Sequence, residues 1–265
     1  MTLSQLFTIS KKQSPEKIWP NPEFFPSDYV EIDTQIVSGL ANGSLTLNLA
    51  VEILRNFYNL GIRNILCTYK VSDGDLNHNS ELVLAWFENL KTLANRDNQL
   101  RNLNLNLSAV YVLDDRFNDL LERACQDTID DKWILIDFPL SGDFLKCKKM
   151  VVELRQSGYN PILTHSEKNR FLLDDLAQFF ELRSTGCRFH IGMDSLFLEE
   201  GNSRHIAAHW LIRNQMVDFI GTNFSDPKQF EKLQQLSDSP LENLLHPLFL
   251  KNNLLNEKRN EAVPF

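Results

Sequence analysis

The sequence has little of what marks a membrane protein, a nucleic-acid-binding protein or a disulfide scaffold. No apolar run approaches the roughly 20 residues that a bilayer-spanning helix needs. Lys and Arg number 27 against 35 Asp and Glu, and the net charge of −8 argues against a nucleic-acid partner, because phosphate binding needs a clustered basic face. The four cysteines, Cys67, Cys125, Cys147 and Cys187, form no C-x-x-C pair, so neither a disulfide framework nor a zinc cluster is expected.

Several targeting and catalytic signatures are also missing. The first residues, M-T-L-S-Q-L-F-T-I-S-K-K-Q, do not combine a basic start with an apolar stretch and a small-residue cleavage site. We therefore expect no secretory signal and predict a cytoplasmic protein. No glycine-rich phosphate loop follows a strand-like run, which disfavours a nucleotide-binding open sheet. The chain has no G-x-S-x-G elbow and no cysteine with an evident catalytic partner, so a nucleophilic hydrolase is not indicated.

What the chain does have is an apolar content of 43%, including 18 Phe, and a regular alternation of strands and helices from Tyr29 onward. The predicted strands are Tyr29–Val37, Arg63–Tyr69, Asn104–Val112, Lys132–Phe138, Asn160–Thr164, Cys187–Ile191 and Val217–Gly221. The predicted helices are Leu45–Leu60, Ser80–Ala94, Asp114–Cys125, Phe144–Ser157, Leu172–Ser184, Ser203–Asn214 and Pro227–Leu236.

The helix ends support this assignment. Gly61, Gly158 and Gly186 each follow a predicted helix, where a left-handed residue belongs, and Asp226 precedes Pro227 as an N-cap. Seven strand–helix units with short connections predict parallel strands and right-handed crossovers. An α/β barrel of seven or eight strands is favoured, with an open doubly wound sheet as the alternative. We expect an irregular lead-in at 1–28, the barrel at 29–236 and a partly disordered C-terminal appendage at 237–265.

In such a barrel the active site is built at the C-terminal tips of the strands. Asp33 and Gln35 share a face of the first strand, and His165 ends the fifth strand. Eight residues make up the candidate pocket: Asp33, Gln35, Lys70, Tyr111, His165, Lys168, His190 and Asn223.

Several of these candidates also have a purely structural interpretation. Asp33 and Gln35 are as well explained by polar residues that close a barrel end, and His165 by a hydrogen-bonded structural histidine. Lys70 cannot ligate a metal near neutral pH; it can hold a phosphate or carboxylate, or pair with Asp33. Asp137, at the fourth tip, is read as structural.

This inventory is short for metal-dependent hydrolysis. A two-metal site needs several carboxylates and imidazoles that converge on both ions and lower the pKa of bound water. The tips offer two histidines, one or two acids and an intruding lysine. We therefore expect no intact metal site.

Three stretches carry a resemblance to a known family. A-V-Y-V-L-D-D-R-F is similar to the family's A-E-Y-M-L-D-D-H-F, G-Y-N-P-I-L-T-H-S-E-K to G-Y-K-P-V-L-A-H-P-E-R, and M-V-D-F-I-G-T-N-F-S to L-V-D-F-V-G-S-D-A-H. From about Tyr29 to Leu236 the chain resembles the bacterial manganese-dependent tyrosine phosphatases of capsule and exopolysaccharide operons. They belong to the PHP (polymerase and histidinol phosphatase) superfamily, and the resemblance implies a distorted seven-stranded TIM-like barrel of PHP type.

The resemblance also implies which positions have changed. The family's opening H-x-H falls on Asp33 and Gln35, and the histidine that closes its T-P-H falls on Lys70. The remaining replacements are Ala41 and Asn42 for paired aspartates, Val110 for the bridging glutamate, Asn223 and Ser225 for D-x-H, and Ser166 and Lys168 for the proline and phosphate-clamping arginine of H-P-E-R. Tyr111 is kept, and His165 is the only metal-ligand position retained.

These replacements predict a catalytically impaired homologue, a pseudophosphatase without its manganese or another cofactor. Its expected partners are a phosphotyrosine peptide, a polysaccharide-export tyrosine kinase or a paralogous phosphatase, with Lys70 and Lys168 holding the phosphate. Two alternatives stay open. One is a weak, rewired metal-dependent phosphatase that uses His165 with Asp33 or His190 around a single ion. The other is a structural subunit of a hetero-oligomer.

Overall fold

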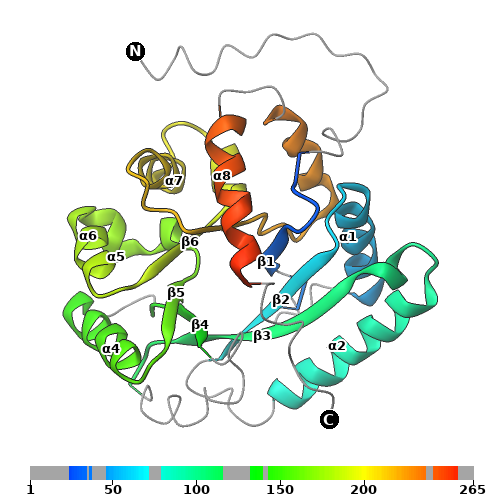
Figure 1. Cartoon of the computed structure of the whole chain (residues 1–265), viewed down its shortest axis with the longest axis horizontal. Coiled ribbons are helices and arrows are strands. Elements are labelled where there is room, and N and C mark those ends of the chain that lie inside the picture. The colour runs from blue at the N-terminus through cyan, green and yellow to red at the C-terminus, as the bar shows by residue number, and fades with distance from the viewer. Residues whose placement is uncertain are drawn as a thin grey trace.

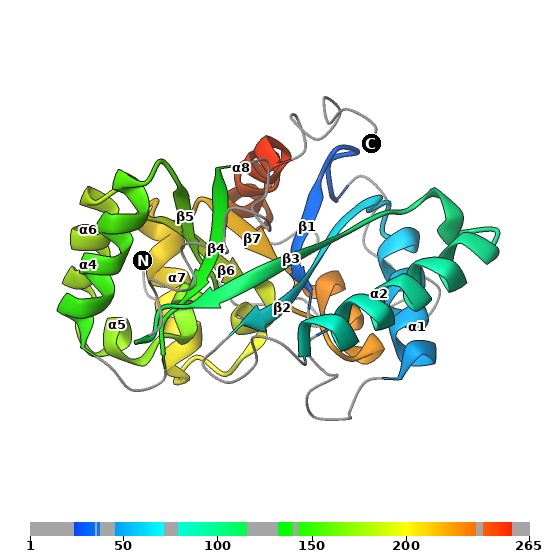
Figure 2. The same ribbon diagram turned by 90° about the horizontal axis from the view of Figure 1, so that it is seen from below.

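The computed structural model describes residues 24–34, 36–37, 46–71, 79–115, 132–139, 143–236 and 241–255. Within these residues, seven parallel strands lie side by side in chain order and curve into a nearly closed barrel (Figures 1 and 2). The strands are β1 (Val30–Thr34), β2 (Asn64–Val71), β3 (Asn104–Val112), β4 (Trp133–Asp137), β5 (Asn160–Leu163), β6 (Arg188–Gly192) and β7 (Phe219–Gly221).

Helices surround the strands on the outside (Figure 1). They are α1 (Leu47–Asn59), α2 (Asn79–Arg96), α4 (Phe144–Gln156), α5 (Arg170–Asp174), α6 (Ala177–Ser184), α7 (Ser203–Arg213) and α8 (Glu242–Asn252). Short 3-10 helices cover Leu100–Asn102, Ser166–Lys168, Met193–Phe197, Pro227–Gln235 and Asn253–Leu255. No described helix has the length and apolar character needed to cross a membrane.

The seven predicted strands and the barrel are confirmed, with differences at several ends. β1 ends at Thr34 instead of Val37, and β7 begins at Phe219 instead of Val217. The predicted helix 172–184 is two helices, because Asp175 has an extended backbone that ends the first, and its Oδ1 accepts a hydrogen bond from Ala177 N at 3.0 Å. The predicted helix 227–236 is a 3-10 helix. The predicted helix 114–125 lies outside the described residues from 116 onward.

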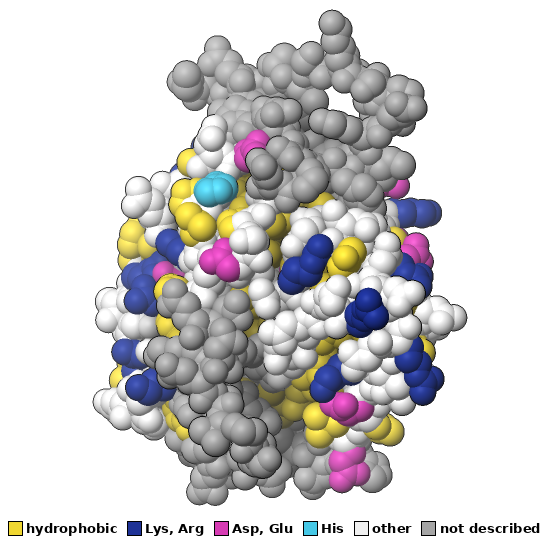
Figure 3. All heavy atoms as spheres, turned by 45° about the vertical axis from the view of Figure 1, so that its right-hand side comes forward, with side chains coloured by type: hydrophobic (Ala, Val, Ile, Leu, Met, Phe, Trp, Pro, Cys, Tyr) yellow, Lys and Arg dark blue, Asp and Glu magenta, His cyan; other side chains and the backbone are white. Residues whose placement is uncertain are grey.

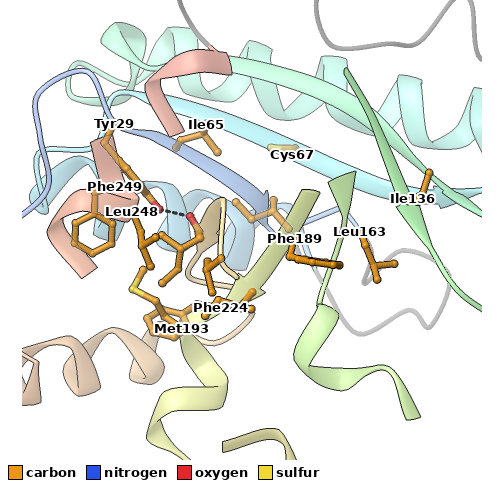
Figure 4. Close-up of a cluster of buried hydrophobic side chains, with 14 of the residues drawn as sticks. Tyr29, Ile65, Cys67, Ile136, Leu163, Phe189, Met193, Phe224, Leu248 and Phe249 are labelled. Atoms are coloured by element: carbon orange, nitrogen blue, oxygen red, sulfur yellow. Dashed lines mark hydrogen bonds between the residues drawn. The ribbon is translucent and has the colours of Figure 1, made fainter. Parts of the chain in front are cut away.

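Side-chain alternation along the strands creates two buried layers. The smaller layer fills the barrel interior with Val30, Ile32, Leu66, Val110, Leu135, Ile162, Phe219 and Leu255. The larger layer lies between strands and helices, and Figure 4 shows part of it, with Ile65 and Cys67 of β2 and Phe189 of β6. The interior is therefore a packed core, as is usual for barrels of this kind.

Side chains bridge the seam where β1 meets β7. Glu31 Oε1 accepts hydrogen bonds from Thr222 N at 2.7 Å and Thr222 Oγ1 at 2.8 Å. The Tyr29 hydroxyl lies 2.9 Å from Glu31 Oε2 and 3.0 Å from the Ile220 carbonyl. Burial, reinforced by the Glu31 carboxylate, raises the pKa of Tyr29 well above its ordinary value, so the phenol keeps the proton that it donates.

Asn252, at the end of α8, completes the same seam. Its Nδ2 donates to the carbonyls of Val30 at 2.8 Å and Ile220 at 2.6 Å, while its Oδ1 accepts from Ile220 N at 3.1 Å. The side-chain amide of Asn252 thus links β1 and β7 through hydrogen bonds to the backbone of both strands.

α8 packs against the barrel, whereas the sequence predicted a partly disordered C-terminal appendage in this region. Its Phe249 is fully buried and packs on Tyr29 (Figure 4), with ring centroids 5.4 Å apart. It also packs on Phe24 and Phe25. Residues 241–255 therefore belong with the barrel, whereas 237–240 and 256–265 lie outside the described residues. The proposed domain boundaries themselves stay predictions.

Gly221 allows β7 to approach β1. A Cβ at this position would lie 2.1 Å from the Ile32 carbonyl oxygen and 2.9 Å from His190 Nε2. No L side chain fits there without movement of backbone, so the seam depends on this glycine.

Candidate functional site at the strand tips

The C-terminal ends of the strands, with the residues that follow them, form the site predicted from the sequence; we call this region the mouth. Its described side chains gather in two groups. One group lies at the tips of β2 and β4, and the other at the tips of β5, β6 and β7.

Lys70 and Asp137 form the first group. The Lys70 ammonium makes an ion pair with Asp137 Oδ2 across the intervening strand β3, where Lys70 is in register with Val110. Asp137 Oδ1 also accepts a hydrogen bond from Phe138 N at 2.9 Å. The Lys70 side chain stays 52% exposed, so its charge remains accessible to a ligand in solution. Lys70 thus pairs with Asp137, where the sequence had suggested Asp33.

His165 and His190 begin the second group. His165 follows β5 with a left-handed backbone (φ 46°), and His190 lies in the middle of β6 with no exposed surface. Their ring centroids are 5.6 Å apart, and His165 N lies 3.5 Å from His190 Nδ1. The absence of a side chain on Gly221 gives His190 Nε2 its place against β7. The two histidines predicted as site residues are therefore neighbours.

Glu167 ties the tip of β5 to the tip of β6. This fully buried residue accepts hydrogen bonds at Oε1 from Gly192 N at 3.2 Å and from Ser195 Oγ at 2.9 Å. Burial raises the pKa of Glu167, although the charge of Lys168 opposes that shift. Sequence reasoning did not select Glu167 as a site residue, although the glutamate of H-S-E-K matches that of the family's H-P-E-R.

Lys168, Asp194 and Asn223 come from three different tips. The Lys168 ammonium lies 3.0 Å from Asp194 Oδ2, and Asn223 Nδ2 donates to the same oxygen at 2.8 Å. The side chains of Lys168 and Asp194 are each only 21% exposed. Sequence reasoning selected Lys168 and Asn223 but missed Asp194. The available signal was an acid two residues after a strand tip, in G-M-D.

The other predicted site residues are placed differently. Val110 belongs to the interior layer, so the adjacent Tyr111 points outward into the layer beneath the helices, where it is 4% exposed. The structure therefore does not bring Tyr111 into the mouth. The side chain of Asp33 and the whole of Gln35 lie outside the described residues.

The described part of the mouth offers few ligands for a divalent ion. Across the described residues, no three His, Cys, Asp or Glu side chains are placed to share a metal ion. Three buried oxygens, Glu167 Oε2, Asp194 Oδ1 and Asn223 Oδ1, have no hydrogen-bond donor in this part of the chain. In contrast to these three oxygens, the carboxylates of Asp137 and Asp194 each have a lysine ammonium as partner.

The comparisons with known proteins agree with this architecture. Residues 29–236 match the sequence model of the family described as capsular polysaccharide synthesis, CpsB/CapC. The chain belongs to the CpsB/CapC family. CapC of Staphylococcus aureus is 23% identical over 245 residues, which cover 89% of this chain and 94% of CapC. The tyrosine-protein phosphatase YwqE of Bacillus subtilis (strain 168) is 23% identical over 200 residues, covering 75% and 78%.

A solved relative confirms the fold. The chain superposes with a TM-score of 0.72 on a structure from a study of YwqE from Bacillus subtilis and CpsB from Streptococcus pneumoniae, which that study calls metal-dependent tyrosine phosphatases. The match covers 89% of this chain and 96% of that one at 20% identity. Identity this low supports the shared barrel and not a shared activity. The family and the PHP-type barrel predicted from the sequence are both confirmed.

Proposed function

We propose that this protein is a catalytically impaired member of its family, a pseudophosphatase. It would act in the cytoplasm by binding and regulation in the phosphotyrosine signalling of capsule or exopolysaccharide synthesis. The single observation that carries the proposal is the pairing of mouth carboxylates with lysines: Asp137 with Lys70, and Asp194 with Lys168.

The pairing matters because metal-dependent hydrolysis needs uncompensated negative charge. Divalent ions are held by carboxylates and neutral imidazoles, and they then lower the pKa of a bound water to generate a nucleophile. In this mouth two lysines already balance Asp137 and Asp194, and burial raises the pKa of Glu167, which favours its neutral form. The described residues therefore supply little net negative charge to attract a divalent ion.

The same lysines support binding of an anion. Lys70 is half exposed at a strand tip and is oriented by Asp137, so an incoming phosphate can compete for its ammonium. The proposed ligand is a phosphotyrosine peptide, such as the tail of a polysaccharide-export tyrosine kinase, and a paralogous phosphatase is the other proposed partner. Family membership and the homology to YwqE support this class of ligand.

One experiment tests both halves of the proposal. A phosphotyrosine peptide is titrated into the purified chain by calorimetry, and its hydrolysis is followed with added manganese. We expect saturable binding without turnover, and loss of binding in Lys70→Glu. Lys149→Glu is the control, because Lys149 is an exposed, ion-paired lysine on α4. Turnover by the unmodified chain, or unchanged binding by Lys70→Glu, would contradict the proposal.

A rewired metal-dependent phosphatase is the second candidate. The neighbouring imidazoles of His165 and His190 and the three buried oxygens favour it. It predicts a stoichiometric metal in the purified protein and phosphatase activity that chelation removes. Elemental analysis beside the hydrolysis assay separates the two candidates.

A structural subunit of a hetero-oligomer is the third candidate. The observation that favours it is the exposure of Leu82 (67%) and Leu84 (50%) on the outer helix α2. Figure 3 shows the face in front as a mixture of hydrophobic, basic and acidic side chains. This candidate predicts assembly that mutations in the mouth leave unchanged.

A further inference from the structure

Lys168, Asp194 and Asn223 form a cluster in which the Lys168 ammonium and the Asn223 amide both contact the Asp194 carboxylate. The Lys168 Nζ and the Asn223 Nδ2 both address Asp194 Oδ2, at 3.0 and 2.8 Å. Each residue comes from a separate strand tip, so tertiary structure alone assembles the three. The two side chains are each about a fifth exposed, so the ion pair is only partly withdrawn from water.

The Asp194 carboxylate lies directly over the tip of β6. A Cβ at Gly192 would be 2.3 Å from Asp194 Oδ1, 3.0 Å from Asn223 Cβ and 3.4 Å from Glu167 Oε1. Only a glycine leaves room for the carboxylate in this place. The space above β6 is therefore filled by the chain's own ion pair and its hydrogen-bonded neighbours.

We infer that the Lys168 ammonium is the resident cation at the tips of β5, β6 and β7 and that the manganese implied by the family does not fit there. This inference rests on the proposed function and gives its physical cause. An ammonium donates three hydrogen bonds and accepts none, so it neutralises Asp194 without ligating an ion. A divalent ion bound to Asp194 would have to lie beside that ammonium, and the two positive charges repel each other at such a separation.

The cluster also contains oxygen atoms that could bind a divalent cation once the Lys168 charge is removed. Glu167 Oε2, Asp194 Oδ1 and Asn223 Oδ1 are buried oxygens with no donor in the described part of the chain. Oxygen ligands suit hard cations such as Mn²⁺ and Mg²⁺. Removal of the Lys168 charge leaves Asp194 Oδ2 with the Asn223 amide as its donor and leaves an oxygen-rich group with net negative charge.

The test measures Mn²⁺ binding without any substrate, by the loss of the free-ion signal in electron paramagnetic resonance. The unmodified chain should show no saturable binding below about 1 mM Mn²⁺. Lys168→Met, which keeps the length of the side chain, should bind at least about tenfold more tightly, and Lys168→Met with Asn223→Asp more tightly still. Lys148→Met is the matched control, because the Lys148 ammonium lies 2.6 Å from Glu181 Oε2 in an ion pair between the outer helices α4 and α6.

A measurement on the unmodified chain keeps the inference testable if these variants fail to fold. Amine acetylation, followed by mass spectrometry, should label Lys168 more slowly than Lys149, whose side chain is 78% exposed. Added Mn²⁺ should leave the Lys168 rate unchanged, whereas displacement of its ammonium by the ion would raise that rate.

Micromolar binding of Mn²⁺ by the unmodified chain, equal binding by Lys168→Met, or a Mn²⁺-dependent rise in Lys168 labelling would each overturn the inference. These outcomes are distinct from those for the proposed function. A chain that fails to bind phosphotyrosine peptide can still exclude Mn²⁺ through Lys168, and an inactive chain can still bind Mn²⁺.

Discussion

The seam between β1 and β7 and the mouth at β5–β7 are both built around a carboxylate, but they satisfy it in opposite ways. At the seam, Glu31 receives its hydrogen bonds from neutral donors on Tyr29 and Thr222. At the mouth, Asp194 is balanced by the charge of Lys168. Neutral donors fix two strands in place, whereas an ion pair sets the charge of the mouth. The comparison predicts that mutations at the seam affect mainly stability and mutations at the mouth mainly binding.

The largest expected effect is at Glu31. Glu31→Ala leaves the Thr222 amide and hydroxyl without their buried acceptor and the Tyr29 hydroxyl with the Ile220 carbonyl alone, which should lower the free energy of unfolding by about 3–5 kcal/mol. Urea denaturation followed by circular dichroism measures it. Glu153→Ala, at a half-exposed surface pair, serves as the control. A loss below about 1 kcal/mol would show that the seam does not depend on this carboxylate.

Gly221→Ala tests the close approach of the two strands. The added methyl group would meet the Ile32 carbonyl at 2.1 Å, so the strands must separate at a cost of about 1–3 kcal/mol. Gly201→Ala is the matched control, since nothing lies within 4 Å of its added Cβ. A decrease in thermal stability for Gly221→Ala alone is the expected result. Equal stability of the two variants would mean that the seam yields easily.

His209 on α7 extends the comparison to a buried group that stays uncharged. Burial, together with His205 and Arg213, lowers the pKa of His209 from 6.5 to about 4. The unfolded chain therefore binds the proton first as pH falls, and the stabilising contribution present above pH 6.5 is lost progressively between about pH 6.5 and 4.

The measurement is the free energy of unfolding at pH 7 and pH 5. The unmodified chain should lose about 1–2 kcal/mol more over this interval than His209→Gln, which has no imidazole to titrate. Identical pH profiles for the two proteins would contradict the assigned shift.

The smallest expected effect on stability is at the mouth. Asp194→Asn removes one half of an ion pair whose side chains are about a fifth exposed, so the free energy of unfolding should fall by about 1 kcal/mol or less. Urea denaturation in low and high salt checks this value, and the loss should shrink as salt screens the pair. A loss as large as that of Glu31→Ala would remove the distinction between seam and mouth.

Much of the fold was predictable because its signals are local. The β3 bounds, Asn104 to Val112, match the prediction, and Gly61, Gly158 and Gly186 all adopt positive φ after helices. The split of 172–184 into two helices was not predicted, because the extended backbone at Asp175 interrupts the helix without disturbing the hydrophobic pattern. The role of α8 was missed because the sequence around Asn252 gives no sign that its side chain joins two strands more than 30 residues away.

In the candidate site, the strand-tip positions were predictable from the sequence, and their interaction partners were not. Strand-tip positions such as Lys70, His165, Lys168 and Asn223 followed from the strand–helix rhythm and from the family resemblance. Their partners did not: Asp137 for Lys70, and Asp194 for Lys168, come from other tips. Tyr111 was assigned to the pocket, yet strand alternation turns it toward the helices.

The order of strands and helices and the family follow from the sequence alone, because hydrophobic period, capping residues and residue type act over a few positions. Which charges meet depends on the three-dimensional fold. Ion pairs and seam hydrogen bonds join residues from separate strands, and their partners are set by strand register and by the bare backbone at Gly192 and Gly221.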